Sequence, residues 1–191
     1  ELRLLGNTVS PCSAGFRSWG QFYVLGYLVG GSPSARIDAV LREDKGYTYG
    51  IRAGFHSWSV DGGFVTRGSV RADSTVDAVR LLLGILEDAR EGFSQDEARE
   101  GRDYVARTAP ARYATADAVA DEVADLLLTE LPLDFPTRTV TEVTELTPEA
   151  LDAAWREWIT GEWTLVVVGD AASIVDGLRE LGRGEVTVVP A

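Results

Sequence analysis

The segment LVGGSPSARIDAVLREDKGYTYG, residues 28–50, decides the expected fold because it joins two helices and a strand within a short stretch. Gly30 and Gly31 are typical of a helix C-terminus, where glycine adopts conformations that other residues avoid. Gly46 follows a cluster of charged residues and precedes two tyrosines. The segment therefore predicts that one helix ends at the double glycine and that a second helix turns through Gly46 into a strand.

The second helix is expected to begin within the sequence SPSAR. Ser32 or Ser34 can cap its N-terminus, and Pro33 suits its first turn. The apolar side chains of this helix share one face, which we expect to be buried: Ile37, Val40 and Leu41.

After Gly46 the apolar residues alternate, which indicates a strand with one buried face. Over residues 47–58, one face carries Tyr47, Tyr49, Ile51, Ala53 and Phe55, and the other carries Arg52, His56 and Trp58. VDGG at residues 60–63 is typical of a hairpin turn, and residues 64–71 form the returning strand.

Strands and helices are also expected on both sides of this hairpin. A strand over residues 2–9 and a buried helix over residues 16–28 precede it. Ser74 opens the next helix, and Ser94 with Glu97 forms a capping box for another. A third helix over residues 115–130 is predicted to face inward with Ala116, Val119, Ala120, Val123 and Leu127.

The C-terminal third is expected to contain a loop, LPLDFPTRTV, and a helix that starts at Thr147-Pro148. A strand (WTLVVVGD), a helix (AASIVDGLREL) and a last strand (EVTVV) follow. The predicted order is β-α-α-β-β-α-α-α-α-β-α-β, an α+β fold. Its strand-helix-strand ending indicates a mixed sheet. No repeat or linker divides the chain, so residues 1–191 are expected to form a single domain.

Composition excludes several function classes. The net charge of −12 argues against nucleic acid or an anionic membrane as the main partner. No apolar run approaches a membrane span, and no signal-peptide pattern is present. The excess of arginine over lysine indicates a GC-rich, bacterial genome, and we expect a cytoplasmic location. Because the chain has no Met and starts at Glu1 inside an alternating segment, we expect an excised domain.

Metal and nucleophile chemistry have little support in the sequence. Cys12 and His56 are the only cysteine and histidine, and neither belongs to a zinc-binding or nucleophile motif. A carboxylate-only site for Mg²⁺ or Ca²⁺ is the alternative left open, but no acidic loop has calcium-binding spacing. We therefore expect no metal site in this chain, and a surface or cross-strand role for His56.

Arg42 and Tyr49 are the better candidates for chemistry. Arg42 is expected on the last turn of the second helix and Tyr49 at the start of the strand. A guanidinium fork and a phenol could bind the carbonyl oxygens of an extended peptide or support an oxyanion. The structural alternative is that Arg42 pairs with Asp38 or Glu43 and that Tyr49 packs in the core.

The same segment resembles the signature of the C-terminal-type domain of the pitrilysin/insulinase family of zinc metallopeptidases, which includes the mitochondrial processing peptidase. The matching positions are Gly30, Gly31, Ser32, Ser34, Arg36, Ile37, Leu41, Arg42, Glu43, Gly46 and Tyr49. SQDEAREGRDYV, LPLDFPTRTVTEVTELTPEAL and TLVVVGD resemble later family segments. Pro33 and the segment VSPCSAGFRSWGQ depart from the family pattern.

The resemblance implies an α+β domain with helices packed on one face of a mixed sheet. In the family, such domains form two halves that close like a clamshell around a peptide. Zinc is bound elsewhere, by an H-x-x-E-H motif in a catalytic domain or partner subunit. For this chain it implies substrate binding by Arg42 and Tyr49, with Gly30, Gly31 and Gly46 as structural turn residues. No cofactor is expected to bind this chain.

The resulting hypothesis is the non-catalytic, substrate-binding domain of a bacterial zinc metalloendopeptidase, inactive alone and completed by a zinc-bearing domain or subunit. One alternative is an inactive scaffold subunit of the same fold, like the core subunits of respiratory complexes. Another is an unrelated α+β enzyme that uses its carboxylates. An H-x-x-E-H motif in a neighbouring sequence or gene would favour the first hypothesis.

Overall fold

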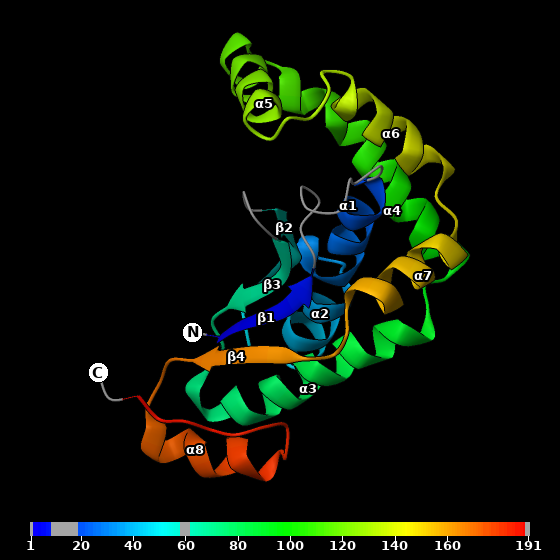
Figure 1. Cartoon of the computed structure of the whole chain (residues 1–191). Helices are drawn as coiled ribbons and strands as arrows, with labels where there is room; N and C mark the ends of the chain where they lie inside the picture. The colour runs from blue at the N-terminus through cyan, green and yellow to red at the C-terminus, as the bar shows by residue number, and fades with distance from the viewer. Residues whose placement is uncertain (1, 9–18, 58–61, 190–191) are drawn as a thin grey trace.

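The computed structural model describes residues 2–8, 19–57 and 62–189. Its sheet contains β1 (Leu2–Thr8), β2 (Ile51–Ser57), β3 (Gly62–Gly68) and β4 (Trp163–Val167). The strand order is β2-β3-β1-β4, and every pair is antiparallel (Figure 1). The first strand therefore lies inside the sheet, between a hairpin and a strand from the far end of the chain.

The helical segments follow the expected order with one addition. They are α1 (Gly20–Gly26), α2 (Arg36–Asp38), α3 (Thr75–Asp88), α4 (Gln95–Thr108), α5 (Ala116–Leu128), α6 (Phe135–Glu145), α7 (Pro148–Trp158) and α8 (Ala171–Glu180). Two π-helical turns extend the first two helices, η1 (Tyr27–Gly31) after α1 and η2 (Ala39–Asp44) after α2. Short 3₁₀ turns are η3 (Ala72–Ser74), η4 (Ala89–Glu91) and η5 (Ala109–Tyr113). The α+β class is confirmed.

One face of the sheet packs against helices and forms the core. Ile51 and Phe64 on this face are completely buried, and Phe64 contacts Trp155 of α7 edge to face at 5.3 Å between ring centroids. α1 and η1 lie directly on β2 because Gly30 has no side chain: a Cβ there would stand 2.5 Å from the Cβ of Ala53. Gly30 is therefore a packing glycine as well as part of the helix end.

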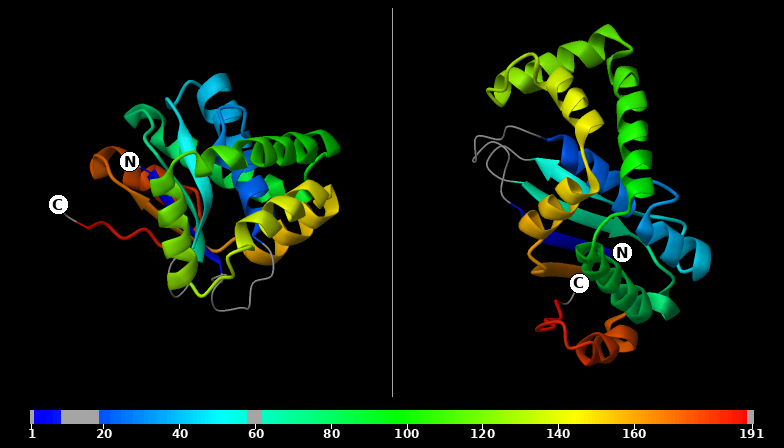
Figure 2. Two further views of the ribbon diagram at one scale, coloured as in Figure 1. Left: turned by 90° about the horizontal axis from the view of Figure 1, so that it is seen from above. Right: turned by 90° about the vertical axis from the view of Figure 1, so that its right-hand side faces the viewer.

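The opposite face of the sheet is open. Arg52, His56 and Arg67 are exposed there, and Val166 of β4 is 46% exposed. Figure 2 shows α5 at the far end of α4 and α6, away from the sheet. Within the described ranges, no helix is long and apolar enough to cross a membrane.

Three local predictions were wrong. LPLDFPTRTV is not a loop throughout, because α6 begins at Phe135 and Pro136 lies in its first turn, where a missing N–H costs little. α5 forms where expected, but the five side chains predicted to face inward (Ala116, Val119, Ala120, Val123 and Leu127) are exposed. Residues 185–189 form no strand, so the parallel element expected at the C-terminus is missing and the sheet is antiparallel rather than mixed.

The cap expected for the second helix does not form either. Ala35 is the N-cap residue, and it makes no side-chain capping bond. Ser32 Oγ instead lies 3.2 Å from Ser34 Oγ, and Ser34 donates to Glu100 of α4. The two serines therefore form one hydrogen bond within the turn between η1 and α2 and a second one from this turn to α4.

Candidate functional site

The candidate site lies where η2 turns into β2. Gly46 has φ +62°, a left-handed conformation that glycine adopts at little cost, and a Cβ there would meet nothing within 4 Å. The N–H of Tyr47 donates back to the carbonyl of Leu41 at 2.9 Å and closes the helix end. The expected turn at Gly46 is thus present.

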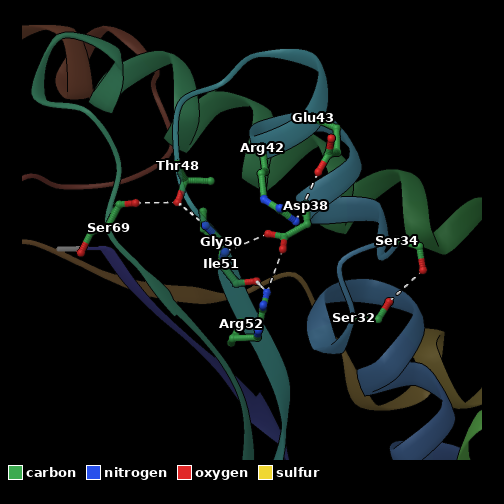
Figure 3. Close-up of polar contacts among 10 residues, drawn as sticks. All are labelled: Ser32, Ser34, Asp38, Arg42, Glu43, Thr48, Gly50, Ile51, Arg52 and Ser69. Carbon is green, nitrogen blue, oxygen red and sulfur yellow. Dashed lines mark hydrogen bonds and ion pairs between the residues drawn. The ribbon is translucent and has the colours of Figure 1, made fainter.

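Asp38 anchors the start of β2. Its carboxylate is completely buried and accepts the backbone N–H of Ile51 at 2.8 Å (Figure 3). The other oxygen accepts Nη1 of Arg52, also at 2.8 Å. One side chain of α2 therefore fixes the first two residues of the strand.

Thr48 anchors the other side of the loop. Its hydroxyl donates to the carbonyl of Ser69 at 2.6 Å and accepts the N–H of Gly50 at 3.0 Å. The carbonyl of the preceding Tyr47 accepts the N–H of Arg71 at 2.8 Å. The residues before and after position 49 are thus held by hydrogen bonds.

Tyr49 itself projects outward from this anchored loop. Its side chain is 100% exposed, so the alternative in which it packs in the core is wrong. Tyr47, two residues earlier, is half-buried and donates its hydroxyl to Asp77 at 2.7 Å. The predicted alternation therefore begins at Ile51 and does not include Tyr49.

Arg42 lies in the π-helical turn η2, and its side chain is 38% exposed. Nη1 of Arg42 forms an ion pair with Glu43 at 3.2 Å, one of the two partners considered in the structural alternative. Asp38, the other partner considered, binds Arg52 instead. An exposed pair of this kind contributes little to stability, so Arg42 can exchange Glu43 for another acceptor.

Arg36 of the same signature has an inward role. Its Nε donates to Glu97 at 2.8 Å, Nη2 donates to the carbonyl of Gly92 at 2.7 Å, and the guanidinium lies 4.4 Å from the ring centre of Phe93. Burial alone would raise the pKa of Glu97, but hydrogen bonds from Arg36 and Ser94 hold that pKa below its ordinary value of 4.5. Arg36 therefore ties α2 to the start of α4.

Sequence reasoning named Asp38 as a possible partner of Arg42 and placed Arg52 on the second face of the strand, but it missed their contact with each other and the role of Thr48. The available signal was Asp38, a carboxylate next to Ile37 and one helical turn before Leu41 on the face predicted to be buried. A carboxylate is rarely buried without a partner, so its position implied a nearby donor. No comparable pattern marked Thr48.

The described residues do not fit a zinc site. They contain no group of three or more His, Cys, Asp or Glu side chains that could hold a metal ion. His56 is exposed on the open face of the sheet, and partial desolvation of its ring together with the charge of Arg67 lowers its pKa below the ordinary 6.5. Cys12 lies outside the described residues.

A comparison with family models identifies the chain. A model described as the peptidase M16 inactive domain matches residues 8–104, just over half of the sequence. The chain belongs to the M16 peptidase family. Its match to an inactive domain confirms the family expected from the signature between Gly30 and Tyr49. A comparison with curated protein sequences gives no match.

Solved structures support the fold of this M16 domain. The M16 inactive domain from Pseudomonas fluorescens has a TM-score of 0.76 at 20% identity, covering 86% of this chain and 39% of that chain. The inactive peptidase domain of a proposed zinc protease from Bordetella parapertussis has a TM-score of 0.71 at 13% identity, and the match covers 86% of this chain and 89% of that chain. A chain of complex III from Candida albicans gives 0.73 at 12% identity, with 95% and 45% covered. The chain thus spans less than half of two of these structures.

Proposed function

We propose that this M16 domain is the non-catalytic, substrate-binding part of a bacterial zinc endopeptidase. A zinc-bearing domain or partner subunit of the family would close on it like a clamshell and carry out hydrolysis. The described residues of this chain lack a set of zinc ligands. The contribution proposed for this chain is to bind and orient the peptide.

The observation that carries the proposal is the position of Tyr49. A completely exposed aromatic side chain gains nothing from the core, yet backbone and side-chain bonds at Thr48 and Ile51 fix the chain on both sides of it. Such a frame reduces the ordering cost of a binding contact. The Tyr49 hydroxyl is suited to donate to an oxygen near the bond to be cleaved.

Arg42 complements Tyr49 from the other side of Gly46. Among the described residues, its one ion-pair partner is the neighbouring exposed carboxylate of Glu43, and the guanidinium can turn toward the carbonyl oxygens of an extended peptide. Its place in a π-helical turn adds support, since such turns are frequent at functional sites.

The test is peptide cleavage by the assembled peptidase, whose zinc-bearing partner is recognised by an H-x-x-E-H motif. We expect Arg42→Ala and Tyr49→Phe each to lower kcat/KM by about 10²-fold, the effect of losing one transition-state donor. Arg107→Ala and Tyr104→Phe on α4 remove matched groups away from the junction and should leave cleavage unchanged. Unchanged turnover in both junction variants would contradict the proposed roles. Absence of any partner with the motif would favour the scaffold alternative.

A further inference from the structure

Arginines occupy three adjacent positions in a row across the sheet. In the strand register, Arg52 of β2 pairs with Arg67 of β3, and Arg67 pairs with Arg3 of β1. Residues paired directly across strands lie on the same face of a sheet. The side chains of Arg52 and Arg67 are both exposed on the open face. We call these three positions the arginine row.

The arginine row is unusual in so acidic a protein. The chain has 30 Asp and Glu residues and a net charge of −12, yet none of the four strands contains an acidic residue. His56, also exposed on this face, is the other titratable side chain of β2. The open face of the sheet is therefore a basic surface within an acidic molecule.

The folded chain only partly compensates this charge. Like charges directly opposite each other on neighbouring strands are destabilising. Asp38 of α2 forms an ion pair with Arg52, although the Arg52 side chain remains 53% exposed. Among the described residues, no acidic side chain forms an ion pair with Arg67. A row that costs stability and has a free guanidinium is suited to bind an external anion.

We propose that the arginine row binds an acidic segment of the peptide substrate. The inference rests on the proposed function, which identifies the anion as part of a peptide. Arg52 is three residues beyond Tyr49, so the row begins at the same end of β2 as the candidate site. Three neighbouring strands place the row over about 10 Å, the length of about three residues of extended peptide.

The chemistry of the row favours carboxylates. The guanidinium groups of Arg52 and Arg67 each offer a planar fork of donors that matches a carboxylate in a bidentate pair. At the other end of the arginine row, position 3 of β1 pairs with Val166 of β4, and Val166 is 46% exposed. A segment with Glu or Asp side chains followed by an apolar residue would therefore match this face.

The test uses the full chain and two fluorescent peptides that differ only in Glu against Gln. We expect the Glu peptide to bind more tightly and Arg67→Gln to weaken that binding about fivefold at low salt, the effect of one exposed charge pair. Binding of the Gln peptide should not change. Arg107→Gln removes the same charge from an exposed site on α4 and serves as the matched control. Melting temperatures establish that both variants are folded.

Failure of this inference can be separated from failure of the proposed function. If wild type binds both peptides equally, or if Arg107→Gln acts as strongly as Arg67→Gln, the arginine row does not select acidic segments. If Tyr49→Phe still lowers kcat/KM of the assembled peptidase in that case, the proposed function stands. Loss of Glu-peptide binding in Arg67→Gln, without any effect of Arg42→Ala or Tyr49→Phe on cleavage by the assembled peptidase, would contradict the proposed function instead. No binding of either peptide contradicts both.

Discussion

The charged side chains differ between the two halves of the signature segment, residues 30–41 and residues 42–49. In the first half, Arg36 reaches α4 and Asp38 is buried beneath β2. In the second half, Arg42 forms an exposed ion pair with its neighbour Glu43, and Tyr49 is completely exposed. The comparison indicates that one family pattern contains two kinds of residue: those that hold the local structure together, such as Arg36 and Asp38, and those that are exposed for binding, such as Arg42 and Tyr49. Residue type alone does not separate the two, because each half contains an arginine.

The largest expected difference between the halves concerns their aspartates. Asp38→Ala leaves the buried N–H of Ile51 without an acceptor and removes the partner of Arg52, and we expect it to cost about 3 kcal/mol of unfolding free energy. Asp44→Ala removes an exposed carboxylate that pairs with Lys45 and should change stability little. Denaturant unfolding of both variants measures the difference. Equal losses would show that the first half does not hold the local structure together.

A smaller difference is expected between the arginines. Arg36→Ala removes two hydrogen bonds and a ring contact and should cost about 2 kcal/mol at pH 7, whereas Arg42→Ala should be close to neutral. The Glu97 pKa is lowered in the folded state, so its contribution is present above the ordinary value of 4.5 and lost as pH falls through the folded pKa.

The pH dependence provides a check on that assignment. The penalty of Arg36→Ala should shrink below about pH 4.5, by at most about 1 kcal/mol because the pair with Glu97 is partly exposed. Unfolding curves of wild type and Arg36→Ala at neutral and acidic pH measure it. A penalty that grows as pH falls would contradict the ion pair as its source.

The sequence was sufficient for the elements whose signals are local. The capping box of Ser94 and Glu97, the helix start at Thr147-Pro148 and the glycine turn at Gly46 all form as predicted. Each of these three features is formed by residues within a few positions of one another, so the local sequence contains all the groups that are needed to predict it.

Predictions that depend on distant partners were less successful. α3 and α5 both have apolar stripes, but Val79 is buried against the core while Val123 is 38% exposed. Periodicity reveals an amphipathic helix, not whether another element covers its face. Residues 185–189 have the alternation of a strand but form none, because strand formation requires backbone hydrogen bonds to a second strand and the local pattern does not specify that partner.

The same limit applies to the candidate site. The turn at Gly46 and the position of Arg42 near the end of the second helix could be predicted from the pattern of the signature. The buried role of Asp38 and the hydroxyl bridge of Thr48 depend on Ile51 and Ser69, whose positions follow from the folded hairpin. The complete exposure of Tyr49 is a consequence of these contacts and was not evident from alternation.

The smallest expected effect on stability is that of replacing Tyr49, because a substrate contact that is fully exposed should contribute nothing to folding. Tyr47 and Tyr49 are chemically identical and two residues apart, but one donates to Asp77 and packs against the core while the other is fully exposed. Thermal unfolding of Tyr47→Ala should give a Tm lower by about 3 °C or more, and Tyr49→Ala should stay within about 2 °C of wild type. An equal loss in both variants would show that Tyr49 is a structural residue and would contradict its assignment as a substrate contact.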